Sequence, residues 1–172
     1  MKTRNTPACN AIAPRAGIFT LLLALGFLAL APMTQAVAPS PDGGYPGGNT
    51  AEGQSALLSR STGTYNTAIG IYSLLSLTDG NFCTGVGAGT LLANTGDSNT
   101  ATGAGALLNN TVGDQNTANG TFALFSNTEG VQNTATGSQA LQSNTTGSFN
   151  MANGYQALLS NSRWQHQHSR RR

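Results

Sequence analysis

The stretch NTATGSQALQSNTTGSF, Asn133 to Phe149, is repeated with variation along most of this chain. With one exception, each copy begins seventeen residues after the one before it. The copies start at Asn49, Asn66, Cys83, Asn99, Asn116, Asn133 and Asn150. A fixed period of this length is typical of a solenoid, in which each repeat forms one coil that stacks on the next.

Aligning the copies gives seventeen columns, which we number from the starting residue. Column 3 is alanine except for Gly85, whereas column 4 varies freely, as expected of a surface position. Column 5 is always glycine: Gly53, Gly70, Gly87, Gly103, Gly120, Gly137 and Gly154. Column 9 is always leucine: Leu57, Leu74, Leu91, Leu107, Leu124, Leu141 and Leu158. These invariant columns are the structural positions of the repeat.

The column pattern predicts an all-β fold. Alternation along T-A-x-G places alanine on one face of a strand and threonine with the variable residue on the other. Glycine at columns 5 and 15 supplies backbone conformations that a side chain would penalise. The ALL segments between glycines are too short for stable helices. We therefore expect a parallel β-solenoid, or β-roll, of 17-residue coils, with two short strands per coil separated by glycine bends.

Column 10 predicts association between copies of the chain. Adjacent residues of a strand point to opposite faces, so one coil cannot bury both column 9 and column 10 inside itself. A long exposed apolar stripe marks an interface. The column 10 residues expected at an oligomer interface are Leu58, Leu75, Leu92, Leu108, Phe125 and Leu159. The simplest assembly is a parallel homotrimer around this ladder.

Composition excludes several classes of protein. Only 8% of residues are charged, and a chain poor in apolar residues can stay disordered, but the strict period argues against disorder. The segment from Asn49 to Asn161 contains five carboxylates and one arginine, so its net charge is negative and a nucleic-acid partner is not expected. With Cys9 in the leader, Cys83 is the only cysteine of the mature chain, which excludes a disulfide framework.

The chain divides into four segments. Residues 1–36 read as a secretory signal, because basic residues precede an apolar run, Gly17 to Ala31, that is shorter than the about 20 residues of a membrane helix. An uncleaved inner-membrane anchor is the alternative. Residues 37–48 form a Pro/Gly linker, residues 49–161 the repeats, and residues 162–172 a basic tail without repeat character. Export predicts a secreted or outer-membrane cell-surface location.

The tail resembles a repeat read in the wrong frame. Back-translated one nucleotide out of frame, SRWQHQHSRR yields P-G-G-N-T-N-T-A-V-G, with NTAVG seventeen residues after Asn150. We therefore expect the tail to be a frameshift product and the natural protein to continue with further repeats. The downstream DNA sequence tests this, since the shifted frame must encode more copies.

At N-T-A-x-G-x-x-A-L, the copies resemble the head repeats of YadA-like trimeric autotransporter adhesins and repeats of phage tail fibres with an intramolecular chaperone domain. The shared core A-x-G-x-x-A occurs at Ala101–Ala106 and Ala135–Ala140. The resemblance covers residues 49–161 and implies a trimeric β-roll with an adhesive or spacer role. The period is longer than the usual head repeat, and neither a stalk nor a barrel segment follows. The resemblance thus implies a fragment, joined to a membrane only through a missing anchor.

The residues offer little for catalysis or cofactors. Both histidines lie in the tail, so a Ser-His-Asp arrangement is not expected. The glycines of Gly85–Gly89 lack the spacing of a phosphate loop, and Asp79, Asp97 and Asp114 lack the pattern of calcium-binding coils. Cys83 replaces the usual Asn and reads as a small buried substitute. The Asn column itself predicts a side-chain amide ladder that satisfies the turn backbone.

These observations predict an exported, non-enzymatic structural or adhesive surface protein, with no catalytic residues, cofactor or metal. Its partners are further copies of itself and a host or surface receptor that the sequence does not identify. A phage-type tail-fibre spacer is the first alternative. The second is an ice-binding solenoid, because Thr50, Thr67, Thr84, Thr100, Thr117 and Thr134 form a file of threonines. A second threonine in the same strand occurs only at Thr102 and Thr136.

Overall fold

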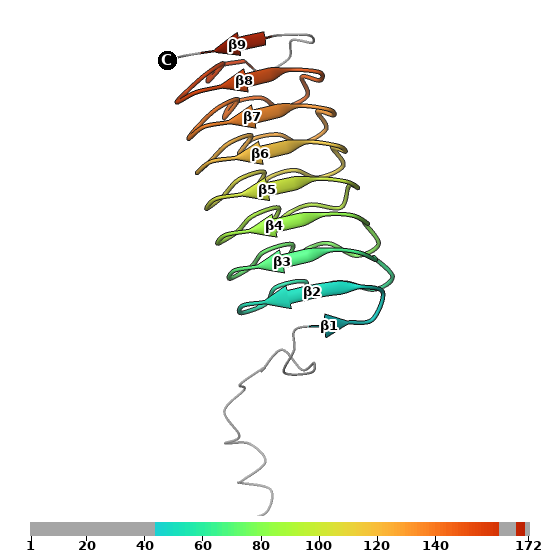
Figure 1. Cartoon of the computed structure of the whole chain (residues 1–172). Coiled ribbons are helices and arrows are strands. Elements are labelled where there is room, and N and C mark those ends of the chain that lie inside the picture. The colour runs from blue at the N-terminus through green and yellow to red at the C-terminus, as the bar shows by residue number, and fades with distance from the viewer. Residues whose placement is uncertain (1–43, 162–167, 171–172) are drawn as a thin grey trace, which may run out of the picture. The chain divides into compact units, whose positions relative to one another are not determined.

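The computed structural model describes residues 44–161 and 168–170 of the chain. The strands in this part form one sheet, in which each strand neighbours the next along the chain. They are β1 (Gly44–Tyr45), β2 (Asn49–Glu52), β3 (Thr67–Ile69), β4 (Thr84–Val86), β5 (Thr100–Thr102), β6 (Thr117–Asn119), β7 (Thr134–Thr136), β8 (Met151–Asn153) and β9 (His168–Arg170). Figure 1 shows them as stacked rungs, joined by loops that return to start the next rung.

Equivalent columns lie directly above one another in this sheet. Strands β2 to β9 pair in parallel, and Thr50 pairs with Thr67, which in turn pairs with Thr84. The shorter copy keeps the alignment, because Thr84 pairs with Thr100. The predicted all-β parallel solenoid is thereby confirmed, and the described residues contain no helix. The number of chains in the assembly stays a prediction.

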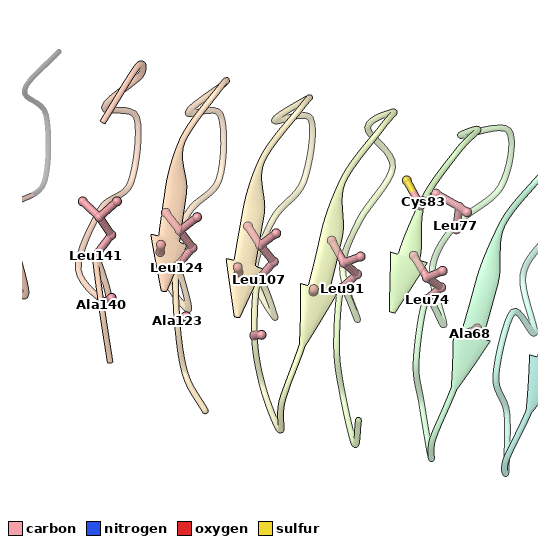
Figure 2. Packing of buried hydrophobic residues seen from close by; sticks show 14 of the residues in the cluster. Ala68, Leu74, Leu77, Cys83, Leu91, Leu107, Ala123, Leu124, Ala140 and Leu141 are labelled. Carbon is pink, nitrogen blue, oxygen red and sulfur yellow. The ribbon is translucent and has the colours of Figure 1, made fainter. Parts of the chain in front are cut away.

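Alanine and leucine fill the interior of the coils. Column 3 alanines such as Ala68 and Ala135 are fully buried between exposed or half-exposed neighbours, as the alternation predicts. Figure 2 shows the column 9 leucines of successive coils in a single file along the stack. All of them are buried except Leu158, which lies in the seventh coil and is partly buried. Column 9 is therefore the inward leucine column.

The expectation of two strands per coil is wrong, because each coil has one strand of three or four residues and a long turn. Left-handed residues at columns 7, 9 and 17 explain the difference. Tyr72, Leu74 and Phe82 have φ of +58°, +51° and +58°, and most other coils repeat these values. A strand cannot continue through such residues, yet their N–H groups still bond to adjacent coils, as in Leu107 N–H to the carbonyl of Ala123 at 3.0 Å.

The left-handed leucines are the least expected feature of the backbone. Their φ lies between +50° and +52° in all seven coils, a region that costs a side chain about 1–2 kcal/mol. Glycine would avoid this cost, but full burial of a leucine side chain contributes about 1.5–3 kcal/mol. Burial of the side chain therefore outweighs backbone strain at column 9.

Glycine is required at columns 5 and 15 because a Cβ at either would meet the backbone of the next coil, as at Gly70, where it would lie 2.5 Å from the carbonyl oxygen of Gly87. Column 5 has a second reason. Column 5 has φ between +112° and +142°, which side chains rarely adopt. Column 15 has no positive φ, but a Cβ at Gly113 would lie 2.5 Å from the carbonyl oxygen of Gly130 and 2.5 Å from Oδ1 of Asn110. The bend predicted at column 15 is thus a site of close approach between coils.

The ends of the repeat region differ from the sequence expectation. Part of the linker is ordered, because β1 pairs antiparallel with β2, Gly44 opposite Thr50, and covers the first strand. In the tail, the backbone of β9 continues the parallel sheet, with His168 opposite Met151. The secretory signal at residues 1–36, and the tail at 162–167 and 171–172, lie outside the described residues.

We predict that Gly113→Ala destabilises the fold by about 3 kcal/mol, because the new Cβ overlaps the carbonyl of Gly130. Gly89→Ala is the matched control. A Cβ at Gly89 would meet only Cδ1 of Leu108, at 3.6 Å, so the cost is that of the left-handed backbone, about 1 kcal/mol. Urea unfolding followed by circular dichroism measures both. Equal losses would contradict the close approach at column 15.

Candidate functional site

The side chains of column 1 form a hydrogen-bonded ladder inside the stack. The N–H of Asn133 donates to Oδ1 of Asn116 at 3.0 Å, and Nδ2 of Asn133 donates to the carbonyl of Gly147 at 2.8 Å. Equivalent bonds join Asn49, Asn66, Asn99, Asn116, Asn133 and Asn150 to their neighbours. Their side chains are almost fully buried. The predicted amide ladder is confirmed.

A second buried ladder lies at column 12, and the sequence analysis missed it. Nδ2 of Asn127 donates to Oδ1 of Asn110 at 2.6 Å and to the carbonyl of Gly130 at 2.9 Å. The same carbonyl accepts Nδ2 of Asn116 at 2.8 Å, so both ladders meet at column 15. The available signal was the recurring Asn at Asn94, Asn110, Asn127, Asn144 and Asn161.

The column 1 ladder is interrupted at Cys83, and the column 12 ladder begins only at Asn94, because Arg60 and Leu77 occupy that column in the first two coils. Leu77 and Cys83 are fully buried. Sγ of Cys83 donates to the carbonyl of Gly96 at 3.3 Å, in place of the missing amide. Burial raises the pKa of the Cys83 thiol to about 11. A buried, protonated thiol is a poor nucleophile, which supports the structural role expected for Cys83.

Two of the three carboxylates considered for calcium bond to the backbone, and Oδ1 of Asp79 accepts the hydroxyl of Thr78 at 2.8 Å. Oδ1 of Asp97 accepts the N–H of Asn81, and Oδ1 of Asp114 accepts the N–H of Asp97, both at 2.7 Å. In the described part of the chain, no three His, Cys, Asp or Glu side chains gather where they could hold a metal ion. The glycines of the phosphate-loop candidate flank or lie in β4 as ordinary column residues. The carboxylates of Asp97 and Asp114 therefore stabilise the turns.

The outer surface beside the buried leucines is apolar. Column 10 is half-buried in most coils, and Leu58 is 56% exposed. Column 7 lies on the same surface, since the rings of Phe122 and Phe125 meet edge to face with centroids 5.4 Å apart. We call the surface made by columns 7 and 10 the leucine face. It contains every residue that the sequence assigns to an oligomer interface: Leu58, Leu75, Leu92, Leu108, Phe125 and Leu159.

The leucine face carries no charge. Columns 6 to 11 lack Asp, Glu, Lys and Arg in every coil from Gln54 to Ser160. Tyr72 and Phe122 at column 7 are each 40% exposed and extend the apolar surface beyond the predicted column. The sequence analysis missed them because it assigned no face to column 7. At about 4.8 Å per coil, seven coils give a surface roughly 30 Å long.

A second regular surface is the outer face of the sheet. Thr50, Thr67, Thr84, Thr100, Thr117 and Thr134 stand in register on adjacent strands. Column 4 beside them is irregular, with Ile69, Val86, Thr102, Asn119 and Thr136 in β3 to β7. These strands contain no charged residue, and Glu52 lies at the N-terminal end of the face. The threonine file is therefore regular, whereas its companion column is not.

No protein-family model matches this chain, and comparisons with curated proteins and with solved structures also gave no match. Among the residues that the structure describes, no helix has the length and apolar character needed to cross a membrane.

We predict that Asn127→Ala destabilises the fold by about 3 kcal/mol, because it leaves the buried Oδ1 of Asn110 without its donor. Asn119→Ala is the control, since Asn119 is exposed at column 4, and its effect should stay within about 0.5 kcal/mol. Chemical unfolding measures both variants. A neutral effect of Asn127→Ala would show that the column 12 ladder contributes nothing to stability.

Proposed function

We propose that this chain is an exported structural and adhesive rod that acts as a parallel homotrimer without catalysis. The observation that carries the proposal is the charge-free leucine face, which extends over all seven coils beside a fully formed interior. Monomeric proteins rarely expose a continuous apolar surface of this extent. Three copies joined along this face would bury it and leave the sheet outward.

The composition of the remaining surface suits a rod that presents a binding surface. Thr, Asn, Ser and Gln dominate the exposed columns, and column 4 changes from coil to coil while its neighbours are constant. Variable residues on a constant backbone let one architecture contact different receptors. The resemblance to head repeats of YadA-like adhesins implies the same role. The tail-fibre spacer remains the alternative, and DNA downstream of the repeats distinguishes them by encoding a barrel anchor or a chaperone domain.

Export rests on the predicted secretory signal. In a bacterial host that exports the full chain, N-terminal sequencing of the mature protein should begin at Val37. Retention of the first 36 residues would favour the inner-membrane anchor instead.

Ice binding is a second candidate function, favoured by the in-register file of six threonines on a sheet whose strands β3 to β7 contain no charged residue. Threonine has few χ1 rotamers, so its hydroxyl and methyl groups keep the spacing of the strands. Thermal hysteresis in a solution of the folded protein tests this function. Absence of thermal hysteresis would exclude ice binding and leave the adhesive rod as the proposed function.

We predict that light scattering gives three times the monomer mass, and that Leu92→Glu weakens association on the order of a hundredfold. A carboxylate buried at the interface without a partner is costly. Thr117→Glu is the matched control, because it places the same charge on the exposed strand face and should leave the trimer intact. A monomeric unmodified protein would overturn the proposed assembly.

A further inference from the structure

Only one of the seven coils is polar in both columns of the leucine face. Column 10 is apolar in six coils, and Gln142 is its one polar residue. Gln139 lies in the same coil at column 7, so both columns of the face carry a carboxamide at this level. In the preceding coil both columns of the face are aromatic, with Phe122 and Phe125 in contact. The face therefore has an aromatic layer and a glutamine layer in adjacent coils, near one end of the stack.

The Gln142 side chain has unused hydrogen-bonding capacity. Its carboxamide bonds to none of the described residues, although it is only partly exposed. Other glutamines on the surface are paired along the stack, for example Gln132 Nε2 to Gln115 Oε1 at 2.9 Å. Gln139 accepts from Nε2 of Gln156 at 2.8 Å, which leaves its own amide N–H groups to donate elsewhere. The glutamine layer therefore has donors and acceptors that can bond to another chain.

We propose that Gln142 sets the axial register and the parallel orientation of the copies that meet on the leucine face. The proposal rests on the proposed function, since it requires association through that face. A carboxamide both donates and accepts, so Gln142 side chains from neighbouring copies at the same level can bond to one another. In an alignment that places Gln142 opposite another column 10 residue, the amide is buried against an apolar side chain and loses its hydrogen bonds to water.

The order of residues along column 10 shows which alignments are penalised. A slip of one coil places Gln142 against Phe125 or Leu159. A centred antiparallel pairing places it against Leu75, because Gln142 is in the sixth coil and Leu75 in the second. An antiparallel pairing that brings Gln142 against itself overlaps only the last three coils and leaves most of the face exposed. Only the parallel, in-register assembly buries the whole face and also pairs the amide.

One polar residue in an apolar interface has the same effect in coiled coils, where a single buried asparagine specifies register at a cost in stability. Gln142→Leu restores the common column residue, so the variant should fold and associate at least as tightly as the unmodified chain. What it should lose is the distinction between alignments. Orientation, rather than affinity or stability, is therefore the property that reports on Gln142.

Cross-linking between the two ends of the rod measures orientation. Leu58 and Leu159 mark the first and last coils of column 10, and each is changed to cysteine in full-length chains that also carry Cys9→Ser. Cys83 is fully buried and should not react. Differently tagged Leu58→Cys and Leu159→Cys chains are co-expressed and treated with a short bis-maleimide. Parallel copies give cross-links between identical ends, whereas antiparallel copies join Leu58→Cys to Leu159→Cys.

We expect identical-end products to dominate in the unmodified background, and Gln142→Leu to raise the mixed-end fraction on the order of tenfold. Gln142→Asn keeps a carboxamide and should retain the parallel preference. Gln132→Leu is the matched control, because it adds the same side chain at exposed column 17, outside the leucine face. Circular dichroism checks that each variant keeps the fold.

The outcomes separate this proposal from the proposed function. A monomer in the unmodified background overturns both. An antiparallel oligomer overturns the role of Gln142 and also the parallel arrangement in the proposed function. A parallel oligomer whose mixed-end fraction is unchanged by Gln142→Leu overturns the role of Gln142 alone.

Discussion

The two buried asparagine ladders are the interaction on which the rest of the structure depends. Each coil turns sharply at column 15, where the carbonyl of a glycine such as Gly130 points into the interior. A buried carbonyl without a donor costs free energy comparable to a lost hydrogen bond. The amides of Asn116 and Asn127 both supply that donor, and each also bonds to the equivalent asparagine of an adjacent coil. The same asparagine side chains therefore satisfy the turn carbonyls and link adjacent coils.

The interruption at Cys83 shows how far this arrangement tolerates change. The thiol of Cys83 takes over the bond to the carbonyl of Gly96, and Nδ2 of Asn99, which also donates to the carbonyl of Gly113, donates to Oδ1 of Asn94. In the same region Gly85 replaces alanine, because Ser73 and Thr90 bring their hydroxyls to 2.5 and 2.9 Å from the position of its Cβ. The substitutions compensate one another locally. The buried polar groups thus keep their hydrogen bonds, and the interior of the coil is not overfilled.

A thin solenoid has little interior, so its surfaces carry the differences between coils. The sheet presents threonine and variable residues, the corner at columns 14 to 16 holds most of the acidic residues, and the leucine face holds none. Charge is therefore segregated from the apolar surface. This segregation is what an assembly of parallel rods requires, because the buried side must be free of unpaired charge while the outer side stays soluble.

The repeat by itself determined the solenoid, its coil length, the inward alanines and the amide ladder of column 1. It did so because identical residues at a fixed spacing must occupy identical environments. The same period identified the glycine columns, but the sequence does not show that Gly113 and Gly120 both lie close to the next coil and that only Gly120 has a positive φ. The prediction of a second strand failed, because left-handed backbone at Leu124 and Phe122 leaves no pattern in side-chain polarity.

Only the tertiary structure decided which leucine column lies inside. Columns 9 and 10 are equally apolar along most of the chain, and the choice depends on the turn that rotates Leu124 inward and leaves Phe125 beside Phe122 on the surface. The role of Asn127 was likewise decided there, since its partners Asn110 and Gly130 belong to different coils. Sequence periodicity specifies that coils stack in register. Packing between coils determines which residues adopt the left-handed backbone conformation. That conformation in turn specifies which side chains each coil encloses.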